Sequence, residues 1–176
     1  MRQRALALAG SVVAVLWAQP GAAQIRVSAS PAVAPDLGRV VMGSSTTTFR
    51  VSVQGGVSRV SGNAVRLSNA GITTPTISID CVLLNLTNLC ALRYMQVAVQ
   101  AVGGSGAASL ETLRVGSLRG ASFRDGQPSE GSTVTFVLNP VGLGTTTFKL
   151  GMDVRLASGT TSGPLTFNYI VTASFL

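Results

Sequence analysis

The sequence predicts an all-β protein: an antiparallel, immunoglobulin-like β-sandwich of about seven to nine strands that follows a cleaved signal peptide. Three observations carry this prediction. Short segments alternate apolar and polar residues with a period of two, which is typical of half-buried strands. Turns rich in Gly, Ser, Pro and Asn separate these segments. Charged residues make up only 11% of the chain, and no window after the leader predicts an amphipathic helix.

Residues 1–23 are predicted to be a secretory signal peptide. A short basic stretch, Met1–Arg4, precedes an apolar run at Ala5–Trp17, and Gly21–Ala23 places small residues before the cleavage point. An uncleaved anchor is the alternative, although a run of 13 residues is short for the ~30 Å of bilayer hydrocarbon. No later segment holds 18 consecutive apolar residues. We therefore expect a mature chain without a transmembrane segment, secreted to the periplasm or to a bacterial cell surface.

Residues 24–35 are predicted to form an extended N-terminal arm ahead of a single β-sandwich domain at 36–176. Three apolar residues of the arm alternate with polar ones, as in a strand. Two prolines, Pro31 and Pro35, then interrupt any continuation into a central strand. An ordinary first edge strand or a frayed terminus is the alternative. The apolar residues of the arm are Ile25, Val27 and Ala29.

The domain is predicted to contain a series of short strands separated by turns. Gly55 and Gly56 mark one turn, and the segment 103–106 marks another. Residues 120–131, which include the pair Asp125 and Gly126, are expected to form a surface loop. The expected strands are 46–54, 57–60, 64–68, 76–81, 93–102, 110–118, 132–138 and 145–156.

The last predicted strand, 163–176, has an apolar face that needs a partner. Its residues alternate between apolar and polar, and only Ile170 interrupts the polar face. A long apolar strand of this kind pairs either within its own sheet or with another polypeptide, so the pattern favours assembly over catalysis. The apolar face consists of Leu165, Phe167, Tyr169, Val171, Ala173 and Phe175.

The residue inventory indicates that the protein is not an enzyme and holds no cofactor or metal. The chain has no histidine, so neither a Ser-His-Asp nor a Cys-His site can be built. Cys81 and Cys90 are its two cysteines. In an oxidising compartment we expect them to form a disulfide worth about 2–3 kcal/mol, with a metal or thiol site as the alternative. The six carboxylates are distant in sequence, which leaves a glycosidase-like pair as a further alternative.

The positive charge of the chain does not predict a nucleic-acid partner. The formal net charge is +7, but the basic residues are scattered and are not interleaved with aromatic residues. A solvated basic surface is the simpler interpretation, and weak affinity for anionic polymers of the cell envelope is the alternative.

Three segments resemble a family of small secreted bacterial β-sandwich proteins of unknown function: Leu37–Val41, Thr46–Val53 and Ser162–Ala173. That family is similar to spore coat protein U and to the pilins of the chaperone–usher pathway. Such pilins carry a glycine fourteen residues from the C-terminus and an aromatic residue next to last. Gly163 and Phe175 occupy these positions here.

The resemblance implies two pairing surfaces. The C-terminal strand would pair with a periplasmic chaperone, and the N-terminal arm would complete the sheet of a like subunit in a homo- or hetero-polymer. Two features depart from the pilin pattern: the cysteines close a short mid-chain loop, and the arm has small apolar residues and two prolines. The implied strand residues are Gly163, Leu165, Phe167, Tyr169, Val171 and Phe175, and the implied donor-arm residues are Ile25, Val27 and Ala29.

Two functions of different classes follow from these patterns. The first is a secreted structural subunit, pilin-like or coat-like, that is assembled at the cell surface by strand exchange. The second is a self-contained secreted β-sandwich that binds an envelope or extracellular ligand. An enzyme with paired carboxylates is the third interpretation.

Overall fold

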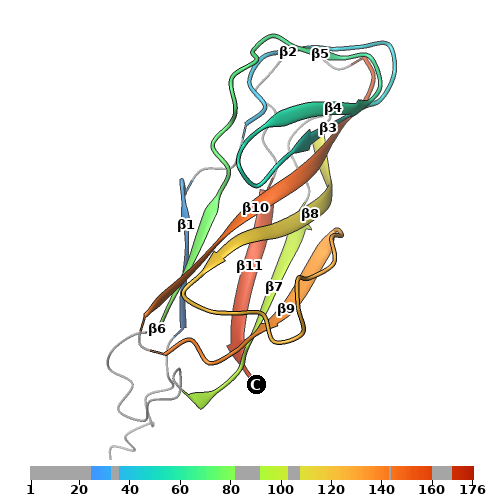
Figure 1. The fold of residues 1–176 in the computed structure, drawn as a ribbon. Coiled ribbons are helices and arrows are strands. Elements are labelled where there is room, and N and C mark those ends of the chain that lie inside the picture. The colour runs from blue at the N-terminus through green and yellow to red at the C-terminus, as the bar shows by residue number, and fades with distance from the viewer. Residues whose placement is uncertain (1–24, 33–35, 82–91, 103–107, 143, 160–167) are drawn as a thin grey trace, which may run out of the picture.

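The protein consists of antiparallel β-sheets. The computed structural model describes residues 25–32, 36–81, 92–102, 108–142, 144–159 and 168–176 (Figure 1). All of its described elements are strands, so the all-β prediction is confirmed. The described part contains eleven strands, two of them only two residues long, and the expected number of seven to nine is not confirmed. They are β1 (Ile25–Ser30), β2 (Val40–Val41), β3 (Thr47–Val51), β4 (Val57–Ser61), β5 (Val65–Arg66), β6 (Thr76–Cys81), β7 (Met95–Val102), β8 (Ala108–Arg119), β9 (Thr133–Leu138), β10 (Thr145–Leu156) and β11 (Asn168–Phe175).

Strand β10 organises the larger sheet, because it pairs with three other strands. It pairs with β6 along Thr145–Lys149 and with β3 along Met152–Leu156. It also pairs with β8 over most of its length, so β6 and β3 share its opposite edge in succession. β1 extends this sheet beyond β6, and β4 extends it beyond β3. Figure 1 shows β10 running diagonally through the molecule between these neighbours.

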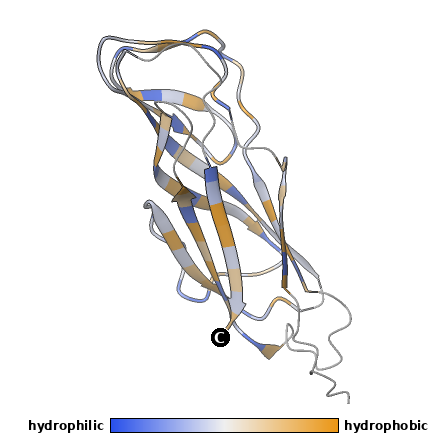
Figure 2. Cartoon of the chain, turned by 180° about the vertical axis from the view of Figure 1, so that it is seen from behind, coloured by the Kyte–Doolittle hydropathy of each residue, from blue (hydrophilic) through white to orange (hydrophobic). Residues whose placement is uncertain are grey.

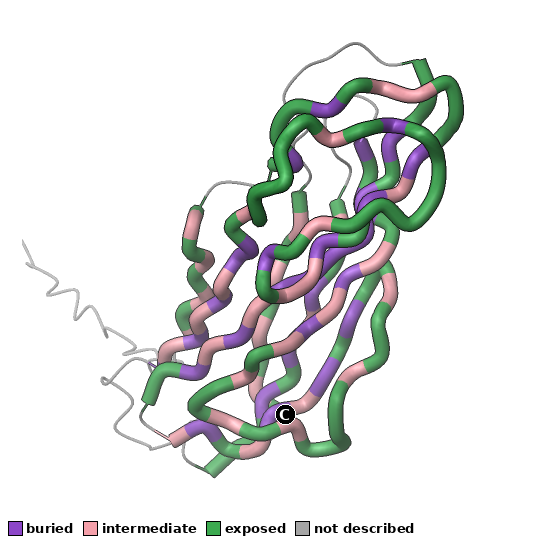
Figure 3. The backbone as a smooth tube through the Cα atoms, turned by 45° about the horizontal axis from the view of Figure 1, so that its top comes forward, coloured by how far each residue is buried: buried purple, intermediate pink, exposed green. Residues whose placement is uncertain are grey.

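A second sheet has the strand order β11–β7–β9, and β2 pairs with β5 at one end of the molecule. β7 is the middle strand, so that Met95 lies opposite Phe175 on one side and Leu138 on the other. Exposed and half-buried residues alternate along β11, and Figure 2 shows hydrophilic and hydrophobic residues on the same strand. Figure 3 shows the matching alternation of buried and exposed residues along the strands. The period-two pattern of the sequence therefore corresponds to an inward and an outward face of each sheet.

The core is formed by inward-facing residues of both sheets. Ile77 on β6 and Phe148 on β10 are fully buried, and they belong to one cluster with Val97 and Leu138 of the second sheet. Phe136 on β9 packs edge-to-face against Phe148, with the ring centroids 5.5 Å apart. Phe136 packs in the same way against Phe123, at 5.4 Å. This is the geometry that aromatic rings prefer, and it ties the two sheets to the segment that carries Phe123.

The segment 120–131, which the sequence predicts to be a surface loop, closes one side of the molecule. Gly131 exchanges backbone hydrogen bonds of 2.7 and 3.2 Å with Leu113 of β8. Phe123 forms a bridge with Leu138 of β9. The segment therefore joins the edges of the two sheets. The turn residues of this segment indicate where the chain reverses, but they do not reveal what it packs against.

Thr47 on β3 is fully buried and holds the connection between β4 and β5. Its hydroxyl donates a hydrogen bond to the carbonyl of Ser45 at 3.2 Å. The same oxygen accepts hydrogen bonds from the backbone N–H groups of Asn63, at 3.1 Å, and Ala64, at 3.0 Å. One buried hydroxyl thus fixes the turn that leads into β5.

We expect Thr47→Val to lower the free energy of unfolding by about 1–3 kcal/mol, because the methyl group leaves two N–H groups without their acceptor. Urea denaturation of the two proteins measures the difference. Thr48→Val makes the same chemical change at a half-buried neighbour on β3 and is the matched control. Equal losses in the two variants would contradict the role given to the Thr47 hydroxyl.

Candidate functional site

The predicted donor-arm residues lie in β1, which pairs within the chain. β1 runs antiparallel to β6 along its whole length, with Val27 opposite Ile79 and Ala29 opposite Ile77. Ile25, Val27 and Ala29 are half-buried against the core, whereas the residues between them are exposed. The predicted alternation is therefore present on a strand of the chain's own sheet. A role of these residues as a donor arm stays a prediction.

The described part of the predicted C-terminal strand is β11, which pairs with β7. Tyr169 lies opposite Ala101, and Val171 lies opposite Val99. Among the described residues, no strand pairs with the second edge of β11. The predicted disulfide stays a prediction, because only one of its cysteines is described. Cys81 is buried at the end of β6, whereas Cys90, Gly163, Leu165 and Phe167 lie outside the described residues.

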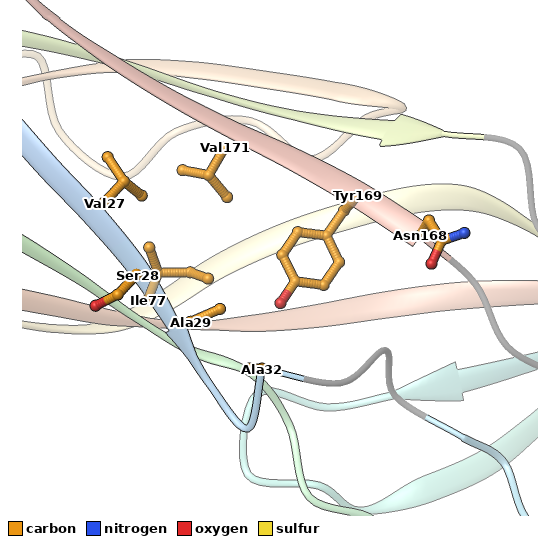
Figure 4. Close-up of a pocket in the computed structure, with 8 residues that line it drawn as sticks. All are labelled: Val27, Ser28, Ala29, Ala32, Ile77, Asn168, Tyr169 and Val171. Carbon is orange, nitrogen blue, oxygen red and sulfur yellow. The ribbon is translucent and has the colours of Figure 1, made fainter.

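β1 and β11 are neighbours at the edges of different sheets, and a groove of about 270 Å³ lies between them. No backbone ladder joins the two strands in the described part of the chain. Figure 4 shows Val27 and Val171 facing each other, while Tyr169 extends from β11 toward β1. This groove is the β1–β11 seam. It is lined by Val27, Ser28, Ala29, Ala32, Ile77, Asn168, Tyr169 and Val171.

Apolar side chains are incompletely covered at the β1–β11 seam. The inward residues of β1 and β11 are only half-buried. By contrast, Ile77 on β6 and Val99 on β7, one strand farther in, are fully buried. Covering apolar surface contributes about 25 cal/mol per Å², so an additional strand here would gain burial and an edge to pair with.

The polar groups of the β1–β11 seam are uncharged. Burial raises the pKa of Tyr169, so its phenol stays protonated at neutral pH and can donate a hydrogen bond. Ser28 contributes a hydroxyl and Asn168 an amide. Since none of the lining residues carries a charge, the seam suits a polypeptide strand better than an ionic ligand.

The end of β11 is fixed to the start of β7. Arg93 Nε donates a hydrogen bond to the carbonyl oxygen of Leu176 at 2.8 Å, and the Arg93 guanidinium lies 5.8 Å from the centroid of the Phe175 ring. The backbone N–H of Leu176 donates to the carbonyl of Tyr94 at 3.0 Å. Phe175 therefore has contacts within its own sheet. A substitution there would disturb folding as well as any assembly, so tests of assembly are better made elsewhere.

Sequence reasoning missed a cluster of charges on the outer face of the larger sheet. Arg50 donates two hydrogen bonds to the Asp153 carboxylate, both at 3.0 Å, and Arg114 donates two more, at 2.8 and 2.7 Å. Burial alone would raise the pKa of Asp153, but the hydrogen bonds from Arg114 and Arg50 outweigh this effect and hold it below its usual value. Only the pairing of β10 with both β3 and β8 brings these residues together.

The carboxylates do not form a metal-binding group among the described residues. Each has a hydrogen-bond or ion-pair partner, four of the six are paired with arginine, and Asp153 and Glu130 share Arg114. These ion pairs bring opposite charges together on the surface of the protein. The pairs are Asp153 with Arg50 and Arg114, Glu130 with Arg114, Glu111 with Arg155, and Asp125 with Arg124, while Asp80 accepts a hydrogen bond from Thr145 and Asp36 accepts one from the Gly38 N–H.

No protein-family model, curated protein or solved structure matches the chain. The resemblance to spore coat protein U and to chaperone–usher pilins therefore stays a prediction, and the function has to be argued from the residues themselves. Within the described ranges, no helix is long and apolar enough to cross a membrane.

Proposed function

We propose that the protein is a secreted structural subunit, pilin-like or coat-like, that assembles at the cell surface by exchange of β1 between copies. The observation that supports this proposal is the β1–β11 seam. There, each of two edge strands presents a half-buried apolar row and an edge without a strand partner in the described part. In this proposal the two sheets form an immunoglobulin-like sandwich, and the seam is its open side.

β1 can be exchanged by breaking a single ladder among the described strands, because it is a short edge strand. It has six residues, and within the described part it belongs to one ladder, with β6. A β1 from a second copy can restore the same register, with Val27 opposite Ile79, so the hydrogen bonds that β1 leaves behind in its own chain form again between two chains. Pro31 and Pro35 lack a backbone N–H, so the residues after β1 are unsuited to continue as a central strand of the same sheet.

A chain whose β1 has left offers a site that is complementary to an incoming strand. The edge of β6 loses its hydrogen-bond partners, and the buried Ile77 and Ile79 lose their cover. An apolar edge of this kind aggregates unless another strand occupies it. A periplasmic chaperone that adds a strand here would hold the subunit until a like subunit replaces it. The proposed partners are therefore a chaperone and like subunits, in a homo- or hetero-polymer.

Cross-linking between copies tests the exchange of β1. Ser28 on β1 lies opposite Ser78 on β6, and both are outside the buried core. When Ser28→Cys chains are assembled together with Ser78→Cys chains and oxidised, we expect disulfide-linked dimers on a non-reducing gel. Ser28→Cys mixed with Ser61→Cys, on the distant β4, is the matched control and gives no such dimers. Absence of the Ser28–Ser78 dimer from the assembled fraction would refute the exchange.

Resistance to detergent is a second measurement of assembly. We expect protein sheared from the cell surface to run as a ladder that collapses to monomer only on boiling, because a buried strand with many main-chain hydrogen bonds dissociates slowly. Val27→Asp places a charge in the half-buried row and should abolish the ladder. Ser30→Asp places the same charge on the exposed face of β1, at a residue that does not line the seam, and should retain the ladder. A ladder that survives Val27→Asp would contradict the proposal.

A self-contained binding domain for an envelope or extracellular ligand is the second candidate function. The observation that favours it is a second concave site, lined by two arginines and formed by residues of β3, β4 and β5. Figure 1 shows these strands at the opposite end of the molecule from the β1–β6 pair. This function requires only a folded monomer, so a single monomer band from unheated surface protein would favour it over exchange.

A further inference from the structure

We propose that the pocket between β3, β4 and β5 binds an acidic sugar, meaning a sugar ring that carries an anionic group. The pocket has a volume of about 450 Å³, within the size range of small-ligand sites. The proposal gives the second candidate function a ligand class and rests on that function, not on strand exchange. This site is the arginine pocket, and it is lined by Phe49, Val57, Arg59, Ala64, Val65, Arg66, Ser68 and Asn69.

Backbone carbonyls hold the two guanidinium groups of the arginine pocket in place. Arg66 Nε donates to the carbonyl of Leu37 and Arg66 Nη1 donates to that of Ala70, both at 2.6 Å. Arg59 Nη1 donates to the carbonyl of Ala64 at 3.1 Å. A carbonyl fixes the direction of a guanidinium without cancelling its charge. Each arginine keeps further N–H donors that an anionic group can use.

The charges of Arg59 and Arg66 are not neutralised within the described part of the chain. The ion pairs found there use other arginines: Arg50, Arg114, Arg124 and Arg155. Two fixed positive charges in one concave site raise the local concentration of anions. A carboxylate or sulfate is therefore the group that the arginine pocket is best suited to hold.

The other walls of the arginine pocket match the rest of a sugar ring. Val57 is half-buried and Val65 is about half exposed, so both offer apolar surface to the C–H face of a ring. Ser68 supplies a hydroxyl and Asn69 an amide, which can hydrogen-bond to sugar hydroxyls. Phe49 is buried and cannot act as a platform for stacked bases, which single-stranded nucleic acids need. The mixture of groups thus favours an acidic sugar over a nucleic acid.

Thr47 helps to position Arg59 of the arginine pocket through the backbone of Ala64. Its hydroxyl accepts the N–H of Ala64, and the carbonyl of Ala64 accepts the hydrogen bond from Arg59. The buried threonine is therefore a positioning residue for Arg59, in addition to its contribution to stability.

Calorimetric titration of the mature protein with a trimer of galacturonic acid tests the proposal, with the neutral galactose trimer as the comparison ligand. We expect binding of the acidic trimer alone, and we expect added salt to weaken it. Arg59→Gln should lower the affinity about tenfold or more, as expected for loss of a charge-assisted hydrogen bond. Arg119→Gln removes the same charge from an exposed position on β8 and should change the affinity less than about twofold. A sulfated galactose oligomer tests which anionic group fits better.

Three results would overturn the arginine pocket as an acidic-sugar site. The neutral trimer could bind as tightly as the acidic one, the two arginine variants could lose affinity equally, or neither anionic sugar could bind. Arg66→Gln gives an independent test if Arg59→Gln fails to fold. The detergent ladder is measured on the same Arg59→Gln protein, where we expect no change, so that failure of this site is distinguished from failure of strand exchange.

Discussion

Replacing Phe148 with alanine is expected to lower the free energy of unfolding by about 3–5 kcal/mol, the usual cost of truncating a buried phenylalanine. Phe148 is fully buried on β10, and its ring packs edge-to-face on Phe136 of the second sheet. The substitution removes apolar burial and a ring contact, and it leaves a cavity between strands that β10 holds in place. Because β10 pairs with β3, β6 and β8, these strands cannot close around the cavity without breaking ladders.

Urea denaturation measures the effect of Phe148→Ala, provided that the dependence on urea concentration is the same in both proteins. Phe123→Ala is the matched control, because Phe123 packs on Phe136 with nearly the same geometry but is only half-buried. We expect a clearly smaller loss from it. Equal losses would show that the aromatic contacts, and not burial beneath β10, determine the cost.

Replacing Asp153 with asparagine is expected to lower the free energy of unfolding by about 2–3 kcal/mol at neutral pH. The change keeps the size of the side chain but removes the negative charge of the carboxylate, to which Arg50 and Arg114 donate four hydrogen bonds. The Asp153 side chain is only 9% exposed, while those of Arg50 and Arg114 are 47% and 20% exposed. Water can therefore solvate the two guanidinium groups in part. The loss of unfolding free energy is for this reason smaller than for a fully buried ion pair.

The pH dependence of the Asp153→Asn effect provides a second check. The pKa of Asp153 lies below its usual value in the folded protein, so the carboxylate contributes its stabilisation fully above its unfolded pKa of about 3.9. That contribution is lost as the pH falls through the folded pKa. The gap between wild type and variant should therefore be constant near neutral pH and shrink in acid. Glu111→Gln, which breaks the exposed pair with Arg155, should cost less than about 1 kcal/mol. A gap for Asp153→Asn that persists in strong acid would contradict this account.

Much of the strand layout could be predicted from local pattern. The sequence predicts strands at 76–81 and 145–156, and β6 and β10 have these bounds. Expectations were less accurate where apolar residues are exposed. The predicted strand 64–68 is reduced to Val65–Arg66, since Val65 and Leu67 remain exposed and no core face holds the segment extended.

The candidate sites were less accessible to sequence reasoning. The alternating rows of β1 and β11 are visible in the sequence, but their meeting at one seam is not. No pattern in the sequence predicts the arginine pocket, because Arg59 and Arg66 are two of the basic residues that are scattered along the chain. What distinguishes them is that they are anchored on carbonyls and not paired with carboxylates, and this depends on how β4, β5 and the residues after β5 fold.

By itself, the sequence determined that the chain is all-β, and it determined most of the segments that are strands. These are properties of neighbouring residues, since alternation along a segment is enough to define a buried and an exposed face. The tertiary structure alone decided that β6 and β3 share one edge of β10, that Asp153 lies between Arg50 and Arg114, and that β1 pairs with β6 of its own chain. Strand order and register depend on which distant residues fill the core together, and a one-residue shift would turn every side chain to the other face.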